Sequence, residues 1–184
     1  EPRPIVVWFY SLENDRENRT LETSVFTSEP VALALRMFRC VKVDVESIQD
    51  SKLRDQYGST PMFVIVDPKK NEVATLAGKR AVSASRFKGF VAGGWGKLFE
   101  MRQRDFVKQM TKILDRLDRV SGKMTVLKAK KARLESRPNA GKARALAKEE
   151  AELNEEQAQI EKDELEIKKR CKLKEEFLED DAEK

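Results

Sequence analysis

The stretch "YGSTPMFVIVD", residues 57–67, decides the fold. Gly58 closes a segment of helical character, and Ser59, Thr60 and Pro61 form a turn. The apolar run that follows, residues 62–66, has the length of a strand, and a continuous run of this kind is typical of a strand covered on both faces. The next segment, "PKKNE" at 68–72, is a turn before a short strand at 73–78, so a strand hairpin is expected here.

Two further strands are expected on the N-terminal side of this hairpin. The run "IVVWFY", residues 5–10, is apolar and rich in β-branched and aromatic residues, and "CVKVDV", residues 40–45, alternates apolar and polar. Helical segments are expected around residues 19–38, at 47–58 and at 83–95, where a glycine pair should end the last one. Because helices separate the first three strands, we expect these strands to pair in parallel. The result is a small mixed sheet with helices on both faces.

The second half of the chain has a different composition and a helical repeat. Lys, Arg, Glu, Ala and Leu dominate residues 97–184, which is typical of long helices. Between Phe106 and Leu127, alternating steps of four and three separate the apolar residues of a first heptad seam, and "SRPNAG" at 136–141 breaks the helix. The first seam comprises Phe99, Phe106, Met110, Ile113, Leu117, Val120, Met124, Leu127 and Leu134. A weaker seam follows, with Leu146, Leu153, Ile160, Ile167, Cys171 and Leu178.

Charge indicates how the two helical arms pair. Residues 97–137 carry 13 Lys plus Arg against 5 Asp plus Glu, whereas residues 142–184 carry 10 against 15. Arms of opposite sign joined by a short turn attract each other, so an antiparallel coiled-coil hairpin is favoured over a parallel homodimer. The imperfect second seam leaves room for a further helix, from a second copy or from another protein.

Composition excludes several classes of function. The chain has no histidine, which removes His-ligated zinc and histidine acid–base chemistry, and no apolar run approaches the length of a membrane span. The net charge of +5 is modest, and the basic arm has an acidic partner in the same chain, so nucleic-acid binding is not favoured. No metal or cofactor site is expected.

Residues 5–95 resemble a thioredoxin-like domain, of the subgroup with an extended first helix. The matching pieces are "VVWFY", "TLETSVFTSEPVALAL", "VKVDVES" and the stretch from "LRDQYGSTPMFVIVD" to "LAG". The resemblance implies that Pro61 is a cis proline ahead of a central strand. The expected organisation is a thioredoxin-like α/β domain at 1–96 and an antiparallel α-helical coiled-coil hairpin at 97–184, with its turn near 136–141.

The redox motif of that family, Cys-x-x-Cys, is absent here. By the resemblance its cysteines should fall near Asp15 and Asn18, and no cysteine lies between residues 1 and 39. Disulfide exchange needs a thiolate, so redox catalysis of the family kind is excluded. In one interpretation the charges of "DREN" only cap a helix and face solvent. In the other they form a recognition surface for an extended peptide, and the candidate residues are Asp15, Arg16, Glu17, Asn18, Thr60 and Pro61.

The sequence therefore predicts a redox-inactive binding or scaffolding protein, not an enzyme, with a protein partner and an arm that could also serve homo-oligomerisation. Two alternatives stay open: a chaperone-like or disulfide-pathway accessory that grips unfolded chains, and an enzyme with a non-cysteine nucleophile in the former redox site. Trp8, Phe9 and Cys40 are expected in the core. Cys171 is expected on the second seam, where an intermolecular disulfide stays open. The compartment is unknown, with a slight preference for an exported protein.

Overall fold

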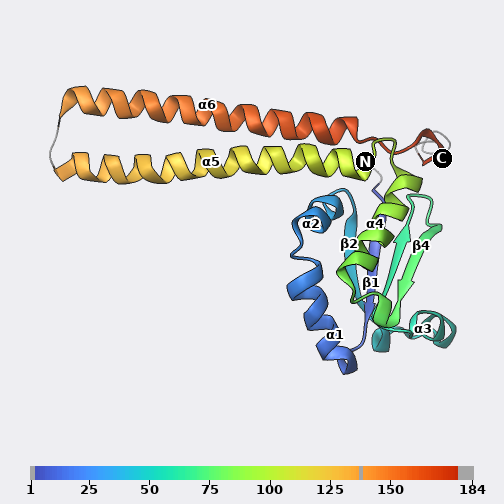
Figure 1. The fold of residues 1–184 in the computed structure, drawn as a ribbon. Helices are drawn as coiled ribbons and strands as arrows, with labels where there is room; N and C mark the ends of the chain where they lie inside the picture. The colour runs from blue at the N-terminus through green and yellow to red at the C-terminus, as the bar shows by residue number, and fades with distance from the viewer. Residues whose placement is uncertain (1–2, 137–138, 178–184) are drawn as a thin grey trace. The chain divides into compact units, whose positions relative to one another are not determined.

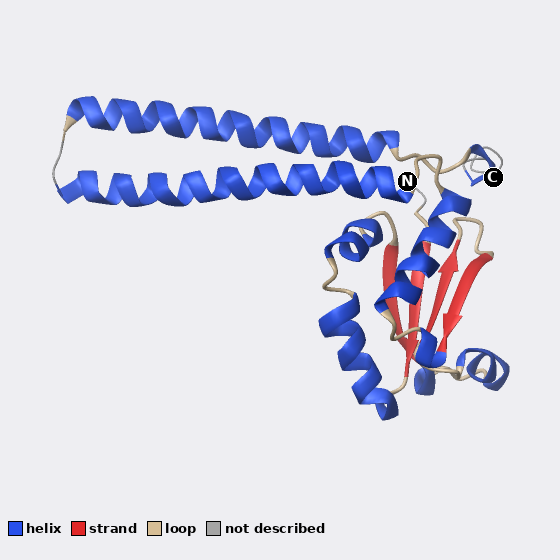
Figure 2. Ribbon diagram, viewed as in Figure 1, coloured by secondary structure: helices blue, strands red, loops and turns tan. Residues whose placement is uncertain are grey.

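The computed structural model describes residues 3–136 and 139–177. Figures 1 and 2 show the helices and strands along the chain. In order they are β1 (Ile5–Tyr10), α1 (Asp15–Thr20) with a π-helical turn (Leu21–Val25), α2 (Glu29–Leu35), β2 (Arg39–Asp44), α3 (Ser51–Tyr57), β3 (Met62–Val66), β4 (Glu72–Ala77), α4 (Ala84–Leu98), α5 (Gln103–Ser136) and α6 (Ala140–Arg170). Short 3-10 turns lie at Leu12–Asn14, Val45–Ser47, Gly78–Arg80 and Glu175–Phe177.

The chain divides into two compact units. The first extends through Val107 and also contains the segment that begins at Cys171, and the second is Lys108–Arg170. The domain boundary expected at residue 96 lies within α4. The first unit therefore combines segments that precede and follow the second unit in the sequence.

The first unit is a four-stranded mixed sheet in the order β2-β1-β3-β4. The pairing of β1 with β2 is parallel, as expected, and β3 with β4 forms the expected antiparallel hairpin. The expectation that β3 would run parallel to the first two strands is wrong, because β1 and β3 are antiparallel. The seven residues of α3 rise only about 10 Å, too little to return along a six-residue strand of about 20 Å. Accordingly α3 lies beyond one end of the sheet (Figure 1).

Apolar side chains are buried on both faces of this sheet. On one face Phe63, which is 1% exposed, contacts an aromatic cluster from β1, the π-helical turn and α4. On the other face Phe9 stacks on Tyr57 of α3, with ring centroids 4.3 Å apart. The buried run of β3 and the buried side chains of Trp8 and Phe9 were thus read correctly from the sequence.

The helix α4 does not end at its glycine pair, as the sequence suggested, but continues to Leu98. Gly94 faces β3, where an added Cβ would lie 2.2 Å from the Cδ1 atom of Ile65. The missing side chain lets the helix backbone approach the sheet closely. Trp95 is fully buried next to it, and its indole N–H donates to the carbonyl oxygen of Met101 at 2.7 Å.

The segment after α6 packs within the first unit. The amide of Glu100 donates to the Lys172 carbonyl at 3.1 Å, and the amide of Lys174 donates to the Leu98 carbonyl at 2.9 Å. Leu173 forms a bridge with Phe99. Because α6 ends at Arg170, Cys171 belongs to this buried segment and not to a helical seam, which corrects the expectation. Leu178, the last residue of the expected seam, lies outside the described residues.

The second unit is an antiparallel pair of helices. The seam of α5 buries Met110, Ile113, Val120 and Leu127, and that of α6 buries Leu153, Ile160 and Ile167. Ion pairs between the helices follow the same antiparallel register, and they comprise Arg116–Asp163 at 2.5 Å, Lys123–Glu156 at 3.7 Å, Lys130–Glu149 at 3.1 Å and Lys131–Glu150. The basic arm therefore contacts the acidic arm, as the charge distribution indicated.

The connection between the arms lies where the sequence placed it. The helix α5 ends at Ser136 and α6 begins at Ala140. Asn139 starts the second arm, because its side-chain Oδ1 accepts from the amide of Lys142 at 2.9 Å in the manner of a helix cap. Residues 137–138 of the expected turn lie outside the described part. The expected architecture is confirmed: a mixed sheet with flanking helices, followed by a long helical hairpin.

Candidate functional site

The corner between β1 and α1 is held by polar side chains. Ser11 follows the last residue of β1, and its Oγ accepts from the amide of Glu13 at 3.2 Å. Asn14 occupies the N-cap position of α1 but makes no side-chain cap bond. Its Nδ2 instead donates to the Thr60 Oγ1 at 2.6 Å and to the Thr60 carbonyl oxygen at 3.2 Å. Asn14 thus ties the corner to the turn before β3.

The four residues of "DREN" do not converge on one point. Asp15 and Arg16 are exposed, and Asp15 forms an ion pair with Arg19 one helical turn later at 2.8 Å. Glu17 is half-buried. Asn18 is buried, and its Nδ2 donates to the Ser11 carbonyl at 2.9 Å. Its Oδ1 is also buried and finds no donor among the residues that the structure describes.

The turn at Thr60 and Pro61 is the second half of the corner. The peptide bond between these residues is cis, as the resemblance implied. Pro61 is buried and Thr60 half-buried. The Thr60 amide donates to the Gly58 carbonyl at 2.8 Å, and its own carbonyl accepts from Asn14. Both main-chain groups of Thr60 therefore take part in hydrogen bonds within the chain.

A pocket of about 500 Å³ opens beside this turn. Three segments line it: the β1–α1 corner, the end of β2 and the region of α3. The lining residues are Ser11, Glu13, Asn14, Val45, Glu46, Arg54, Asp55, Gly58, Ser59 and Thr60. Of the six candidate residues, Thr60 alone is among them. The Nε of Arg54 is buried and has no acceptor within the described structure.

Sequence reasoning did not identify Asn14 or the contribution of α3. The resemblance placed the first cysteine of the family motif near Asp15. The candidate residues therefore began at Asp15 and did not include Asn14. Its side chain, however, is the group that contacts the cis-proline turn. Nothing in the local sequence marks Arg54 and Asp55 as site residues, because a charged pair on a short helix usually faces solvent. Only the position of α3 at the end of the sheet brings them to the pocket.

Neither thiol lies in this pocket. Cys40 is exposed on β2, which corrects the expectation of a core residue, because β2 is an edge strand and Cys40 lies near its start. Contacts with neighbouring apolar atoms still raise the pKa of the Cys40 thiol. Burial raises the pKa of Cys171 to about 12. Both thiols are therefore neutral near pH 7 and are poor nucleophiles.

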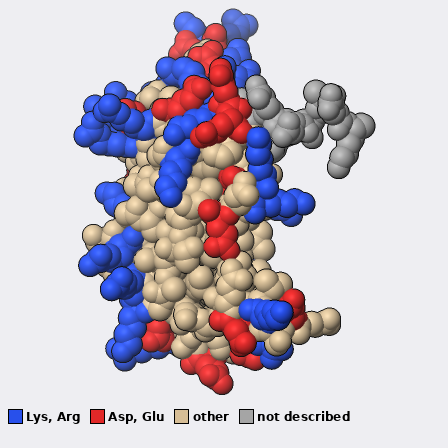
Figure 3. Space-filling model, turned by 90° about the vertical axis from the view of Figure 1, so that its right-hand side faces the viewer, with Lys and Arg blue, Asp and Glu red and all other residues tan. Residues whose placement is uncertain are grey.

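Other kinds of site were sought in the described residues. No group of three or more acidic or cysteine side chains in residues 3–136 and 139–177 is arranged to hold a metal ion. None of the helices within these ranges is both long enough and apolar enough to cross a membrane. On the face drawn in Figure 3, basic and acidic side chains are interspersed, with an uncharged area between those at its top and bottom.

Comparison with known proteins gives a partial match. No protein family model and no curated protein sequence matches the chain. Among solved structures, the chain is similar to a thioredoxin from Thermus thermophilus, with 26% sequence identity over 48% of this chain and 71% of that chain and a TM-score of 0.41. The likeness covers about half of this chain, and the corner of Asn14, Asp15 and their neighbours lies in the N-terminal unit.

Proposed function

We propose that this protein is a redox-inactive binding module, which recognises a polypeptide at the corner beside the cis-proline turn. The chemistry of the corner supports this, because amide and carboxylate side chains replace sulfur there. The Asn14 amide donates to Thr60 at this corner, so an unreactive side chain lies against the cis-proline turn. A scaffold of this kind keeps the geometry for recognition without the thiolate that exchange requires.

The pocket of about 500 Å³ beside the turn is the observation that carries the proposal. Leu12 is 72% exposed, and its neighbours in the sequence, Ser11 and Glu13, both line the pocket. An exposed apolar anchor beside a polar rim is the usual composition of a protein interface. Glu13, Glu46 and Asp55 outnumber the single cation Arg54 in the lining, so the favoured partner segment carries Lys or Arg.

The hairpin supports a second contact, with a protein partner or a second copy of the chain. Its helices of 34 and 31 residues correspond to a rise of about 45–50 Å. Val126 and Leu165 are more than half exposed on its outer faces. We propose that the arm sets the reach or assembly of the binding module.

Selection of peptide ligands tests the binding site. Displayed heptapeptides would be selected against the full chain, and the Kd values of synthetic copies measured by calorimetry. We expect extended peptides with a basic residue, which lose at least about tenfold in affinity when Ser59→Trp fills the pocket. Ser121→Trp, at an exposed position of α5, is the matched control and should leave the Kd unchanged. Selected peptides that tolerate Ser59→Trp would disprove the site.

An insulin-reduction assay tests the absence of redox activity. The expected rate equals that of the reductant alone. A protein-dependent rate that disappears in Cys40→Ser or Cys171→Ser would disprove the proposal, whatever the peptide selection gives.

The exposure of Leu12 also favours a second function, chaperone-like binding of unfolded chains. The distinguishing measurement is aggregation of a denatured test protein in the presence of the full chain. Suppression that Leu12→Ser abolishes, together with peptides that share only apolar residues, would support holding of unfolded polypeptide. Peptides with a defined basic position and no suppression would support a specific partner.

A further inference from the structure

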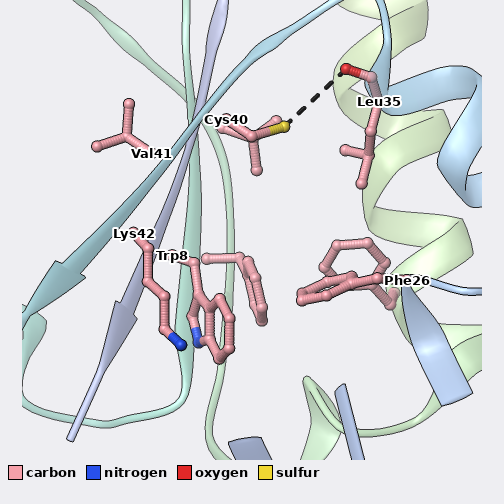
Figure 4. A pocket seen from close by; sticks show the side chains of 9 residues that line it. Trp8, Phe26, Leu35, Cys40, Val41 and Lys42 are labelled. Atoms are coloured by element: carbon pink, nitrogen blue, oxygen red, sulfur yellow. Dashed lines mark hydrogen bonds between the residues drawn. The ribbon is translucent and has the colours of Figure 1, made fainter. Parts of the chain in front are cut away.

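A second pocket, separate from the cis-proline corner, lies between the β1–β2 side of the sheet and the helices that cover it (Figure 4). Its volume is about 170 Å³, and it shares no residue with the pocket beside Thr60. The lining residues are Val6, Trp8, Phe26, Leu35, Cys40, Val41, Lys42, Phe63 and Phe87. Nothing in the proposed peptide-binding function uses it.

The size and lining of this pocket suit one aromatic ring. An apolar protein cavity of about 150 Å³ stays free of water and admits benzene. Here Trp8, Phe26 and Phe63 form an aromatic wall, with ring centroids 5.3–6.0 Å apart. In Figure 4 Leu35 and Cys40 lie across the pocket from Trp8, and the Cys40 thiol is directed to the Leu35 carbonyl at 4.0 Å.

Two hydrogen-bond donors, the Trp8 indole N–H and the Lys42 ammonium, lie on one side of the pocket. They indicate which polar group an aromatic ligand should carry. The Trp8 indole Nε1 is buried, and the described residues offer it no acceptor, whereas Trp95 donates to Met101. The Lys42 ammonium lies 4.2 Å from the centre of the Trp8 ring. Figure 4 shows it beside the nitrogen-bearing edge of that ring. Lys42 also pairs with Glu22 at 2.9 Å, at a half-exposed position, so its other protons are available.

We propose that this pocket binds a small aromatic carboxylate. The ring occupies the space between Trp8, Phe26 and Leu35, and the carboxylate accepts from the Lys42 ammonium. As the Lys42 stem moves aside, the second carboxylate oxygen accepts from the Trp8 indole N–H. An apolar side chain of a protein partner would fill the same volume but would leave the Trp8 indole N–H without an acceptor. The ligand therefore combines one ring with one anionic group.

Titration of the full chain with benzoate, followed by ¹H–¹⁵N spectra, tests the proposal directly. The chain has two tryptophans, Trp8 and Trp95, and therefore two indole signals, which the variant Trp8→Phe assigns. We expect a saturable downfield shift of the Trp8 indole signal, because it gains a hydrogen bond, while the bonded Trp95 indole stays in place. A Trp8 signal that does not move, or moves without saturation, would overturn the proposal.

Variants around Lys42 test the recognition of charge. Lys42→Met keeps the aliphatic stem and should weaken benzoate binding about tenfold, as expected for a lost charge-assisted hydrogen bond. Glu22→Gln removes the competing carboxylate and should strengthen binding roughly two- to fivefold, the range for an exposed ion pair. Affinity that is unchanged in both variants would overturn the role of Lys42.

Toluene and a pocket-filling variant complete the test. Toluene has the ring without the acceptor and should bind about tenfold more weakly than benzoate. Equal affinity for the two would overturn the aromatic acid and indicate an apolar side chain as the occupant. Cys40→Leu should abolish binding while the Trp95 signal confirms a folded domain. Benzoate binding that survives this substitution would place the ligand elsewhere.

Discussion

The two units of this chain are stabilised in different ways. The first buries large aromatic side chains on both faces of a sheet, and Phe63, Phe87 and Trp95 are at most 1% exposed. The hairpin buries one seam of aliphatic residues, and the side chains of the ion pairs between its two helices are about one-third to more than one-half exposed. Hydrophobic burial responds little to pH and salt, whereas exposed ion pairs respond to both. The stability of the first unit should therefore depend mainly on how well its buried side chains fill the core. The stability of the hairpin should also depend on pH and salt.

The largest expected effect is the loss of an aromatic ring from the first unit. Phe63→Ala should lower the free energy of unfolding by about 3–5 kcal/mol, because the removed ring leaves a cavity between Trp8 and Phe87. Tryptophan fluorescence during denaturation measures it, since both tryptophans lie in this unit. A loss below about 1 kcal/mol would show that the aromatic cluster does not hold the sheet.

The matching substitution in the hairpin should cost less and act locally. Ile160 is fully buried in the seam of α6. Ile160→Ala should destabilise the hairpin by about 2–3 kcal/mol, near the lower end for such changes, because a two-helix seam can close around the gap. Circular dichroism at 222 nm should show an earlier helical transition while the fluorescence transition stays in place. If both transitions move together, the two units unfold as one and the comparison fails.

The difference between the units also explains what could be predicted from the sequence. The hairpin follows local rules: heptad spacing, a proline-containing break and arm charge all depend on neighbours along the chain. The direction of β3 and the pocket beside Thr60 depend on where the short helix α3 lies in space. Likewise, the exposure of Cys40 follows from β2 being an edge strand, and an alternating segment does not reveal its place in the sheet order.

A smaller effect concerns the acid response of the hairpin. The hydrogen bond from Arg116, supported by one from Gln159, lowers the pKa of Asp163. A carboxylate whose folded pKa lies below its unfolded value stabilises the fold above the ordinary Asp pKa of about 4. That contribution is lost as the pH falls further through the folded pKa.

Thermal melting of the helical signal from pH 7 to pH 2 measures this contribution. The Tm of the parent should exceed that of Asp163→Asn at pH 7, and the difference should shrink below about pH 4. Lys148 pairs with Glu152 within one helix and is largely exposed, so Glu152→Gln is a matched control with little effect on Tm. A difference between parent and Asp163→Asn that persists at pH 2 would contradict the ion pair as its cause.

The smallest expected effect lies in the first unit, at its own charge-coupled contact. The Tyr57 hydroxyl donates to the Glu72 carboxylate at 2.5 Å, and this bond, with desolvation and the Glu72 charge, raises the pKa of Tyr57 to about 12. A raised tyrosine pKa stabilises the fold below the unfolded pKa of about 10, and the gain is lost as the pH rises towards 12.

Absorbance at 295 nm follows this ionisation. In a Tyr10→Phe background Tyr57 is the one tyrosine left, so its titration is read alone. Glu72→Gln should lower the pKa of Tyr57 towards 10 and leave the hairpin melt unchanged, because Glu72 lies on β4. A pKa near 10 in the parent would mean that the bond between α3 and β4 is absent in solution. The helix that lines the cis-proline pocket would then be held by the stack of Tyr57 on Phe9 without this polar contact.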